Sequence, residues 1–199
     1  MTGAWIAVSL VGAYLAGSFP TGVLVARARG VDITRTGSGN IGATNVARSL
    51  GKKSGLFVLA VDMMKGLGPT LAVKLVFAGE PNGAWLVSGT ALAAVLGHVF
   101  PIWLRGKGGK GVATAFGGFV AISHLAAVAA LGVWLAVFLP KRVASLASLC
   151  AATTTPLVLL VEGAKWPYVI LGGSVWLVVV VRHRGNLVRL WRGEERRLP

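Results

Sequence analysis

Apolar stretches alternate with short polar stretches along the whole chain. The first apolar stretch covers residues 4–25, and the second covers 55–78, where Asp62, Lys65 and Pro69 interrupt it. Each is long enough to cross about 30 Å of hydrocarbon as a helix. Asp62 and Lys65 are three residues apart, so on a helix they can pair with each other. The pattern predicts an all-α, polytopic membrane protein.

Three further stretches, 83–104, 143–161 and 166–181, each read as a single span. The stretch 112–139 is generous for one span and short for two, and His124 lies near its middle. If the chain crosses twice there, with a turn near His124, the total is seven transmembrane helices. Five is the alternative.

Basic residues gather in the gaps between these stretches. The gaps at 27–53 and 105–111 and the tail at 182–197 carry most of the lysine and arginine. The positive-inside rule places all three in the cytoplasm. The N-terminus is then outside, the C-terminus is cytoplasmic, and the number of spans is odd.

Composition agrees with this interpretation. The chain is 55% hydrophobic and 13% charged, whereas soluble domains carry about a quarter charged residues. Its net charge of +14 lies between apolar segments, which favours anionic headgroups or phosphorylated substrates over nucleic acid. The single cysteine, Cys150, excludes a disulfide framework and a cysteine-based metal site. We expect one integral-membrane domain over 1–199, with no obligate protein partner evident.

Three polar segments carry the candidate chemistry: 37–48, 97–114 and 182–195. Their glycines let backbone N–H groups approach an anion, and serine, threonine, asparagine, lysine and arginine supply further donors. They contain no HExxH motif, no Cys/His cluster and no close pair of carboxylates, so no metal and no cofactor is predicted. His98 and His183 are candidate proton acceptors or phosphate ligands, with an ordinary interfacial histidine as the alternative.

The same segments, in this order, resemble the bacterial acyl-phosphate:glycerol-3-phosphate acyltransferases, the PlsY family. The matching positions are Gly17-Ser18-Phe19-Pro20, Gly37-Ser38, Asn40, Gly42-Ala43-Thr44-Asn45, Arg48, Asp62, Lys65-Gly66, Gly97-His98, Phe100-Pro101, Lys107 to Thr114, Arg182-His183, Asn186, Arg189-Leu190, Gly193 and Glu195. Gly106 departs from the pattern, because the family usually has an aromatic residue there.

The resemblance implies transfer of a fatty acyl group from acyl-phosphate to the 1-hydroxyl of glycerol 3-phosphate. The products would be lysophosphatidic acid and phosphate, in the first acylation of bacterial phospholipid synthesis at the cytoplasmic face of the inner membrane. Neither acyl-CoA nor acyl carrier protein would serve as donor. The family attaches activity to residues matching Ser38, Arg48, His183 and Asn186, glycerol-phosphate binding to the glycines of the second segment, and structural integrity to Glu195.

The mechanism we expect is direct attack of the glycerol hydroxyl on the acyl carbonyl, with two phosphates held by two sets of donors. Which set holds which phosphate stays open, and so does the base, which is His98, His183 or a substrate phosphate oxygen. The predicted substrate-binding residues are Asn40, Thr44, Asn45, His98, Lys107, Gly108, Gly109, Lys110 and Gly111. The alternatives are a transporter for a phosphorylated metabolite, with Asp62 and Lys65 as a coupling pair, and a lipid-binding structural protein.

Overall fold

The computed structural model describes residues 2–198, and within them it contains helices and no strand. The helices in chain order are α1 (Gly3–Ser18), α2 (Thr21–Arg27), α3 (Ala43–Leu50), α4 (Lys52–Phe77), α5 (Gly83–Val99), the 3₁₀ turn η1 (Ile102–Leu104), α6 (Val112–Ile122), α7 (His124–Lys141), α8 (Ala144–Val161), α9 (Trp166–Arg182) and α10 (Arg184–Trp191). The predicted all-α membrane architecture is therefore confirmed.

Five segments are long and apolar enough to cross a membrane: Gly3–Arg27, Lys52–Phe77, Gly83–Leu104, His124–Lys141 and Ala144–Val161. A sixth is α9 taken together with α10, although the two helices meet at an angle of 62°. The first segment is broken at Phe19 and Pro20, between α1 and α2.

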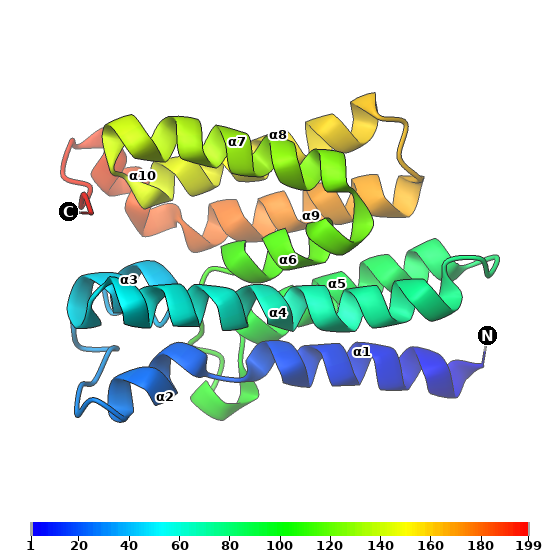
Figure 1. Ribbon diagram of the computed structural model, residues 1–199, viewed down its shortest axis with the longest axis horizontal. Helices are drawn as coiled ribbons and strands as arrows, with labels where there is room; N and C mark the ends of the chain where they lie inside the picture. Colours follow the sequence, from blue (N-terminus) through cyan, green and yellow to red (C-terminus); the bar gives the residue numbers. More distant parts are fainter. Residues whose placement is uncertain (1, 199) are drawn as a thin grey trace.

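The ambiguous stretch 112–139 forms two helices. The chain turns at Ser123, next to His124 where the sequence predicts a turn, and α6 and α7 run in opposite directions (Figure 1). The eleven residues of α6 extend only about 16 Å, roughly half the thickness of a bilayer core. The total is seven if this half-length helix is included.

Lys74 of α4 caps the C-terminal end of α6. Its ammonium group donates to the carbonyls of Ala121, at 2.7 Å, and Ile122, at 3.2 Å. These carbonyls are among the last of α6 and have no N–H partner within the helix, so Lys74 supplies the donor that the helix end lacks. The position of α6 therefore depends on a lysine in the neighbouring helix.

Glycines allow the helices to approach closely, as is common in membrane bundles. A Cβ atom at Gly66 of α4 would lie 1.9 Å from the carbonyl oxygen of Thr114 in α6. A Cβ at Gly17 of α1 would lie 2.0 Å from that of Ala94 in α5. Backbone contact at these points fixes α6 against α4 and α1 against α5.

The two termini lie at opposite ends of the bundle (Figure 1). The end with the C-terminus also holds α3 and α10, together with the beginning of α4. The basic segments 27–53 and 182–197 therefore lie at this end, and the segment 105–111 is joined to the second of them by the hydrogen bonds of Arg182 to Gly108 and Gly109. That this end faces the cytoplasm remains a prediction from the positive-inside rule.

Candidate active site

The three polar segments meet around one cavity of about 310 Å³ at the basic end of the bundle. Most of the predicted site residues line it, and they come from the loop before α3, from α3, α5, the loop before α6, and the junction of α9 with α10. These residues are Ser38, Asn40, Thr44, Asn45, Arg48, His98, Lys110, Gly111, His183 and Asn186.

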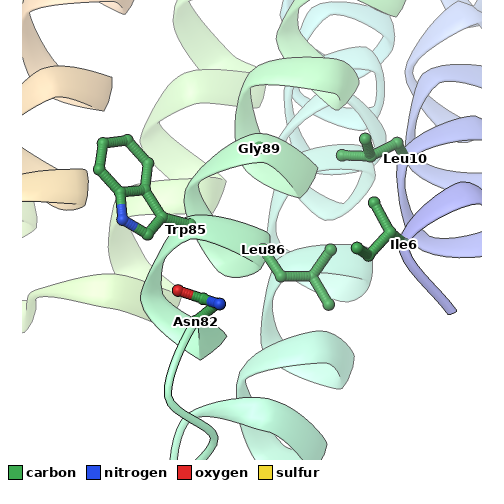
Figure 2. Close-up of a pocket in the computed structure, with 6 residues that line it drawn as sticks. All are labelled: Ile6, Leu10, Asn82, Trp85, Leu86 and Gly89. Atoms are coloured by element: carbon green, nitrogen blue, oxygen red, sulfur yellow. The ribbon is translucent and has the colours of Figure 1, made fainter. Parts of the chain in front are cut away.

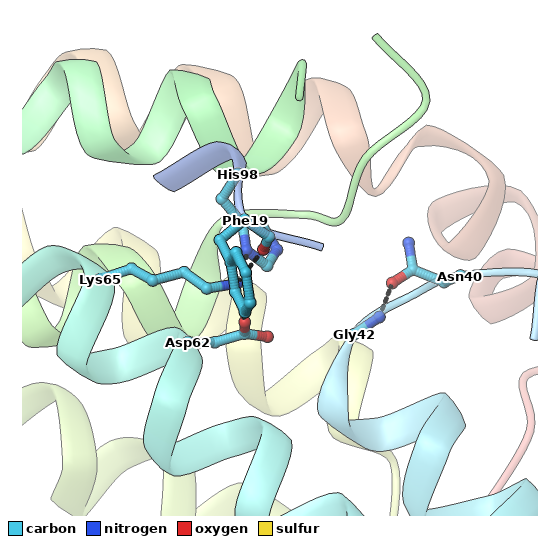
Figure 3. A network of polar contacts seen from close by, with 6 residues as sticks. All are labelled: Phe19, Asn40, Gly42, Asp62, Lys65 and His98. Carbon is cyan, nitrogen blue, oxygen red and sulfur yellow. Dashed lines mark hydrogen bonds and ion pairs between the residues drawn. The ribbon is translucent and has the colours of Figure 1, made fainter. Parts of the chain in front are cut away.

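Amide side chains shape the loop that precedes α3. Asn45 is 2% exposed; its Oδ1 accepts the N–H of Ser38 at 2.8 Å and its Nδ2 donates to the Thr36 carbonyl at 2.9 Å. The Oδ1 of Asn40 accepts the N–H of Gly42 at 2.9 Å (Figure 3). With its polar atoms engaged in this way, Asn45 acts on the loop, and the loop in turn holds Ser38 at the cavity.

Two helices begin at the cavity. Ala43 and Thr44 open α3, and Val112 and Ala113 open α6, and all four line the cavity. The first N–H groups of a helix have no acceptor within it, and together with the helix dipole they favour an anion. Arg48 lies one turn along α3 from Thr44, and its pKa is lowered by burial and further by the charge of Arg196. The site therefore gathers positive charge that an anion would neutralise.

Lys110 and Asn186 form a second polar group at the cavity. The Lys110 ammonium donates to Asn186 Oδ1 at 2.5 Å, and Asn186 Nδ2 donates to Glu195 Oε1 at 2.7 Å. The same carboxylate accepts from Ser145 at 3.1 Å and from Arg189 at 2.9 Å. Burial lowers the pKa of Lys110 to about 8, although Glu195 opposes this shift.

His183 lies at the junction of α9 and α10 and is buried. Its Nδ1 is 2.8 Å from the Val179 carbonyl oxygen, which can only accept, so Nδ1 carries the proton. In the neutral ring this leaves the lone pair on Nε2. His183 is therefore held in the tautomer that can accept a proton or a hydrogen bond in the cavity.

Gly108 and Gly109 do not line the cavity, and their N–H groups are already engaged. They donate to the carbonyls of Val99, at 3.2 Å, and His98, at 3.0 Å. The guanidinium of Arg182 donates to the carbonyls of the same two glycines, at 3.0 and 3.2 Å. These bonds join α5 to α9 through the two glycines, and their predicted part in binding glycerol 3-phosphate stays a prediction.

Lys107 is exposed and also lies outside the cavity lining. The structure therefore brings together all the predicted site residues except Lys107, Gly108 and Gly109. Gly109 is still required next to His98, because a Cβ there would lie 2.0 Å from His98 Nε2.

A buried ion pair borders the cavity (Figure 3). Lys65 Nζ lies 2.6 Å from Asp62 Oδ1, as the sequence predicts, and 2.6 Å from the Phe19 carbonyl oxygen at the break between α1 and α2. His98 Nδ1 is 3.8 Å from Asp62 Oδ1. Lys65 thus holds the broken first span against α4, while Asp62 and His98 face the cavity.

An apolar groove continues from this polar end into the bundle, between α4, α6, α7, α8 and α9. Leu59 of α4 and Leu131 of α7 line it and are 44% and 43% exposed, so it opens sideways between these two helices. The sequence analysis missed this groove. Ser145, Ser148 and Thr155 of α8 line it, but the same helix carries Thr153 and Thr154, so its polar positions do not mark one face in the sequence.

The cavity is also lined by polar residues that were not among the predicted site residues: Asp62, Ser145, Ser148, Thr155, Arg189, Glu195 and Arg196. Of these, Asp62, Arg189 and Glu195 are positions at which the sequence resembles the family. Among residues 2–198, no three histidine, cysteine, aspartate or glutamate side chains lie close enough together to hold a metal ion. A separate apolar pocket of about 350 Å³ lies between α1 and the start of α5, at the other end of the bundle (Figure 2). It has no charged side chain in its lining.

Comparison with known proteins gives one consistent result. The family model for glycerol-3-phosphate acyltransferase matches residues 7–193. The glycerol-3-phosphate acyltransferase of Geotalea daltonii is 46% identical over 188 residues, covering 94% of this chain and 95% of that one. The protein of the same name from Myxococcus xanthus is 47% identical over 186 residues, covering 92% and 95%.

Two solved structures are similar to the chain. A crystal structure of PlsY, an integral membrane glycerol 3-phosphate acyltransferase in its glycerol 3-phosphate form, superposes with a TM-score of 0.93 at 41% identity. The alignment covers 98% of this chain and 96% of that one. The lysophosphatidic acid form of PlsY gives a TM-score of 0.90, also at 41% identity, covering 98% and 95%.

Proposed function

Because the chain belongs to the glycerol-3-phosphate acyltransferase family, we propose that its acyl donor is an acyl-phosphate and its acceptor the 1-hydroxyl of sn-glycerol 3-phosphate. The products are 1-acyl-glycerol 3-phosphate and inorganic phosphate. The observation that carries this proposal is a cavity with two sets of anion-binding groups at the mouth of an apolar groove. Both substrates carry a phosphate and only one carries an alkyl chain.

The two phosphates have separate donors. One set, which we assign to the acyl-phosphate, comprises the first N–H groups of α3 with Ser38 and Arg48. The other comprises Lys110, Asn186 and the first N–H groups of α6, and we assign it to glycerol 3-phosphate because the family attaches glycerol-phosphate binding to the segment that contains Lys110. The acyl chain occupies the groove and reaches it from the bilayer between α4 and α7. The carbonyl carbon then lies at the boundary between the polar and apolar parts of the cavity, beside His183.

In the reaction, the glycerol hydroxyl oxygen forms a bond to the acyl carbonyl carbon and the bond from that carbon to the phosphate oxygen breaks. The electron pair leaves with the phosphate, which is already a good leaving group. The hydroxyl proton passes either to His183 Nε2 or to a phosphate oxygen of the substrate, whose second pKa is about 6. Replacing His183 by glutamine separates the two routes, because only the first is lost.

This reaction takes place in one integral-membrane domain over 1–199, in the bacterial cytoplasmic membrane with the cavity at the cytoplasmic face. The nearby bilayer supplies one substrate and receives one product, so the membrane lipid itself is the partner. Neither acyl-CoA nor acyl carrier protein is a donor, because each would have to place a much larger group at the site that accepts a small phosphate.

The test uses the full chain purified in detergent, with labelled glycerol 3-phosphate and, in parallel, palmitoyl phosphate, palmitoyl-CoA or palmitoyl acyl carrier protein. We expect labelled lysophosphatidic acid, with release of phosphate, from palmitoyl phosphate alone. Arg48→Ala should lower the rate by a factor of about 10² or more, because a buried charge contact to a phosphate is lost.

The matched control is Arg35→Ala, in the loop before α3. Arg35 is exposed and pairs only with Asp32, so its removal should leave the rate unchanged. Product formation from palmitoyl-CoA but not from palmitoyl phosphate would reject the proposed donor.

A further inference from the structure

The apolar groove has a definite depth. On α8 its lining runs from Ser145, beside Glu195, to Thr155, a distance of about 15 Å along the helix axis. On α9 it runs from His183 to Val175, about 12 Å along that axis. An extended alkyl chain rises about 1.25 Å per carbon, so a chain that starts at His183 and follows about 12 to 15 Å of helix places roughly ten to twelve carbons inside the protein.

Four residues form the deepest layer of the lining, one from each surrounding helix, and all four are buried. They are Phe119 of α6, Ala130 of α7, Thr155 of α8 and Val175 of α9. One helical turn beyond them, the bundle is filled by a further buried layer, which belongs to the main hydrophobic core. That second layer consists of Ile122, Ala126, Leu159 and Leu171.

Close packing of this second layer closes the groove. Leu159 is fully buried and lies one turn beyond Thr155 on α8, and Leu171 lies one turn beyond Val175 on α9. Protein interiors are packed like crystals, so a chain that reaches this layer can extend no further without moving side chains.

We propose that this floor sets the acyl-chain preference of the enzyme, with Thr155 and Phe119 as the specificity-determining residues. This inference rests on the function proposed above. Lipid tails are as apolar as the groove, so moving a chain from the bilayer into the protein gains little free energy for each methylene group. Discrimination between chain lengths therefore comes from steric fit at the floor.

Thr155 is the better residue to enlarge. It is 5% exposed, and its hydroxyl donates a hydrogen bond to the Ala151 carbonyl at 3.1 Å, so the side chain needs no hydrogen bond from the substrate. Thr155→Phe should fill the last part of the groove. Thr155→Val, which keeps the volume, should leave it unchanged. Phe119→Ala should have the opposite effect and deepen the groove.

The experiment measures kcat/KM for octanoyl, decanoyl, lauroyl and palmitoyl phosphate with each purified variant. For Thr155→Phe we expect the ratio of kcat/KM for lauroyl to that for octanoyl phosphate to fall at least tenfold, with octanoyl phosphate near the wild-type value. For Phe119→Ala we expect the ratio of kcat/KM for palmitoyl to that for lauroyl phosphate to rise. Leu157→Phe is the matched control on α8, because Leu157 is 57% exposed to lipid.

A second measurement does not depend on the donor. Lysophosphatidic acids with 8 to 12 carbons should each raise the Tm of the wild-type protein, and Thr155→Phe should lose this shift selectively for the longer ones. If Thr155→Phe does not fold, Thr155→Leu and Phe119→Ala carry the same test from both directions.

Equal changes for all chain lengths, or the same change in Leu157→Phe, would overturn the floor as the determinant. If the proposed donor is wrong, the result is different: the wild-type protein forms no product from any acyl-phosphate. The chain-length dependence of the Tm shift can still be measured in that case.

Discussion

Glu195 is the residue whose removal should disturb the site most, although we assign it no contact with substrate. Its carboxylate accepts hydrogen bonds from Asn186, Ser145 and Arg189, at 2.7, 3.1 and 2.9 Å. It thereby ties α10 and the chain after it to the start of α8. Replacing Glu195 by alanine removes the acceptor from all three donors at once.

The cost can be estimated from the burial of each donor. Asn186 and Ser145 are both 7% exposed, and two buried donors without an acceptor cost about 2–6 kcal/mol together. The side chain of Arg189 is 37% exposed, so water can replace its bond and the ion pair adds about 1 kcal/mol at most. A loss of this size corresponds to a fall in Tm of roughly 4–28 °C for a chain of this length.

The measurement is thermal unfolding in detergent for the wild type, Glu195→Ala, Glu195→Gln and Glu194→Ala. Glutamine keeps an oxygen for one donor and loses the charge, so the Tm of Glu195→Gln should lie between the Tm of Glu195→Ala and that of the wild type. Glu194 is exposed, and its alanine variant is the matched control, with no expected change.

Activity should fall in parallel. Asn186 holds the Lys110 ammonium at 2.5 Å, and without Glu195 its amide is free to turn away. We expect a higher KM for glycerol 3-phosphate in Glu195→Ala. Equal Tm values for Glu195→Ala and Glu194→Ala would refute this account of the carboxylate.

Three further predictions follow from single contacts. The pKa of Lys110 is lowered to about 8, so its ammonium group is charged below this pH and loses its charge above it. KM for glycerol 3-phosphate should therefore rise above about pH 8, and Lys110→Arg should remove that rise. Gly66→Ala should destabilise the protein by about 1–3 kcal/mol or more, since the new Cβ meets the Thr114 carbonyl, whereas Gly68→Ala in the same helix meets nothing within 4 Å; the Tm of each variant checks this. Lys74→Met should lower the Tm and raise the KM of the substrate whose phosphate is held by the first turn of α6, because the carbonyls at the other end of that helix lose their donor. Lys74→Arg should restore part of the Tm and part of the KM.

Much of the architecture could be read from the sequence, because its causes are local. A helix that crosses a bilayer needs an apolar stretch of a certain length. Every such stretch of this chain appears as a helix that begins and ends within three residues of the predicted ends, apart from breaks at Phe19-Pro20, Phe100-Pro101 and Ser123. The Asp62–Lys65 pair also follows from spacing on one helix. The gathering of the three polar segments was predicted because they lie on the same side of successive apolar stretches.

Only the tertiary structure shows which residues of those segments line the cavity and which join one helix to another. Gly108 and Gly109 look in sequence like a phosphate-binding loop, yet their N–H groups are taken by carbonyls of α5, a helix that ends before them in the chain. The Glu195 carboxylate collects donors from α8 and α10, which no spacing rule connects.

The groove and its floor were also outside the reach of the sequence, for a physical reason. In a soluble protein the apolar face of a helix shows which side packs inward. In a membrane the lipid-facing side is apolar as well, so Thr155 and Leu157 lie in one uniform pattern although one lines the groove and the other faces the bilayer. The sequence determines that these helices cross the membrane and where their charges lie, while the close contacts at residues such as Gly66 decide which faces meet and what space is left between them.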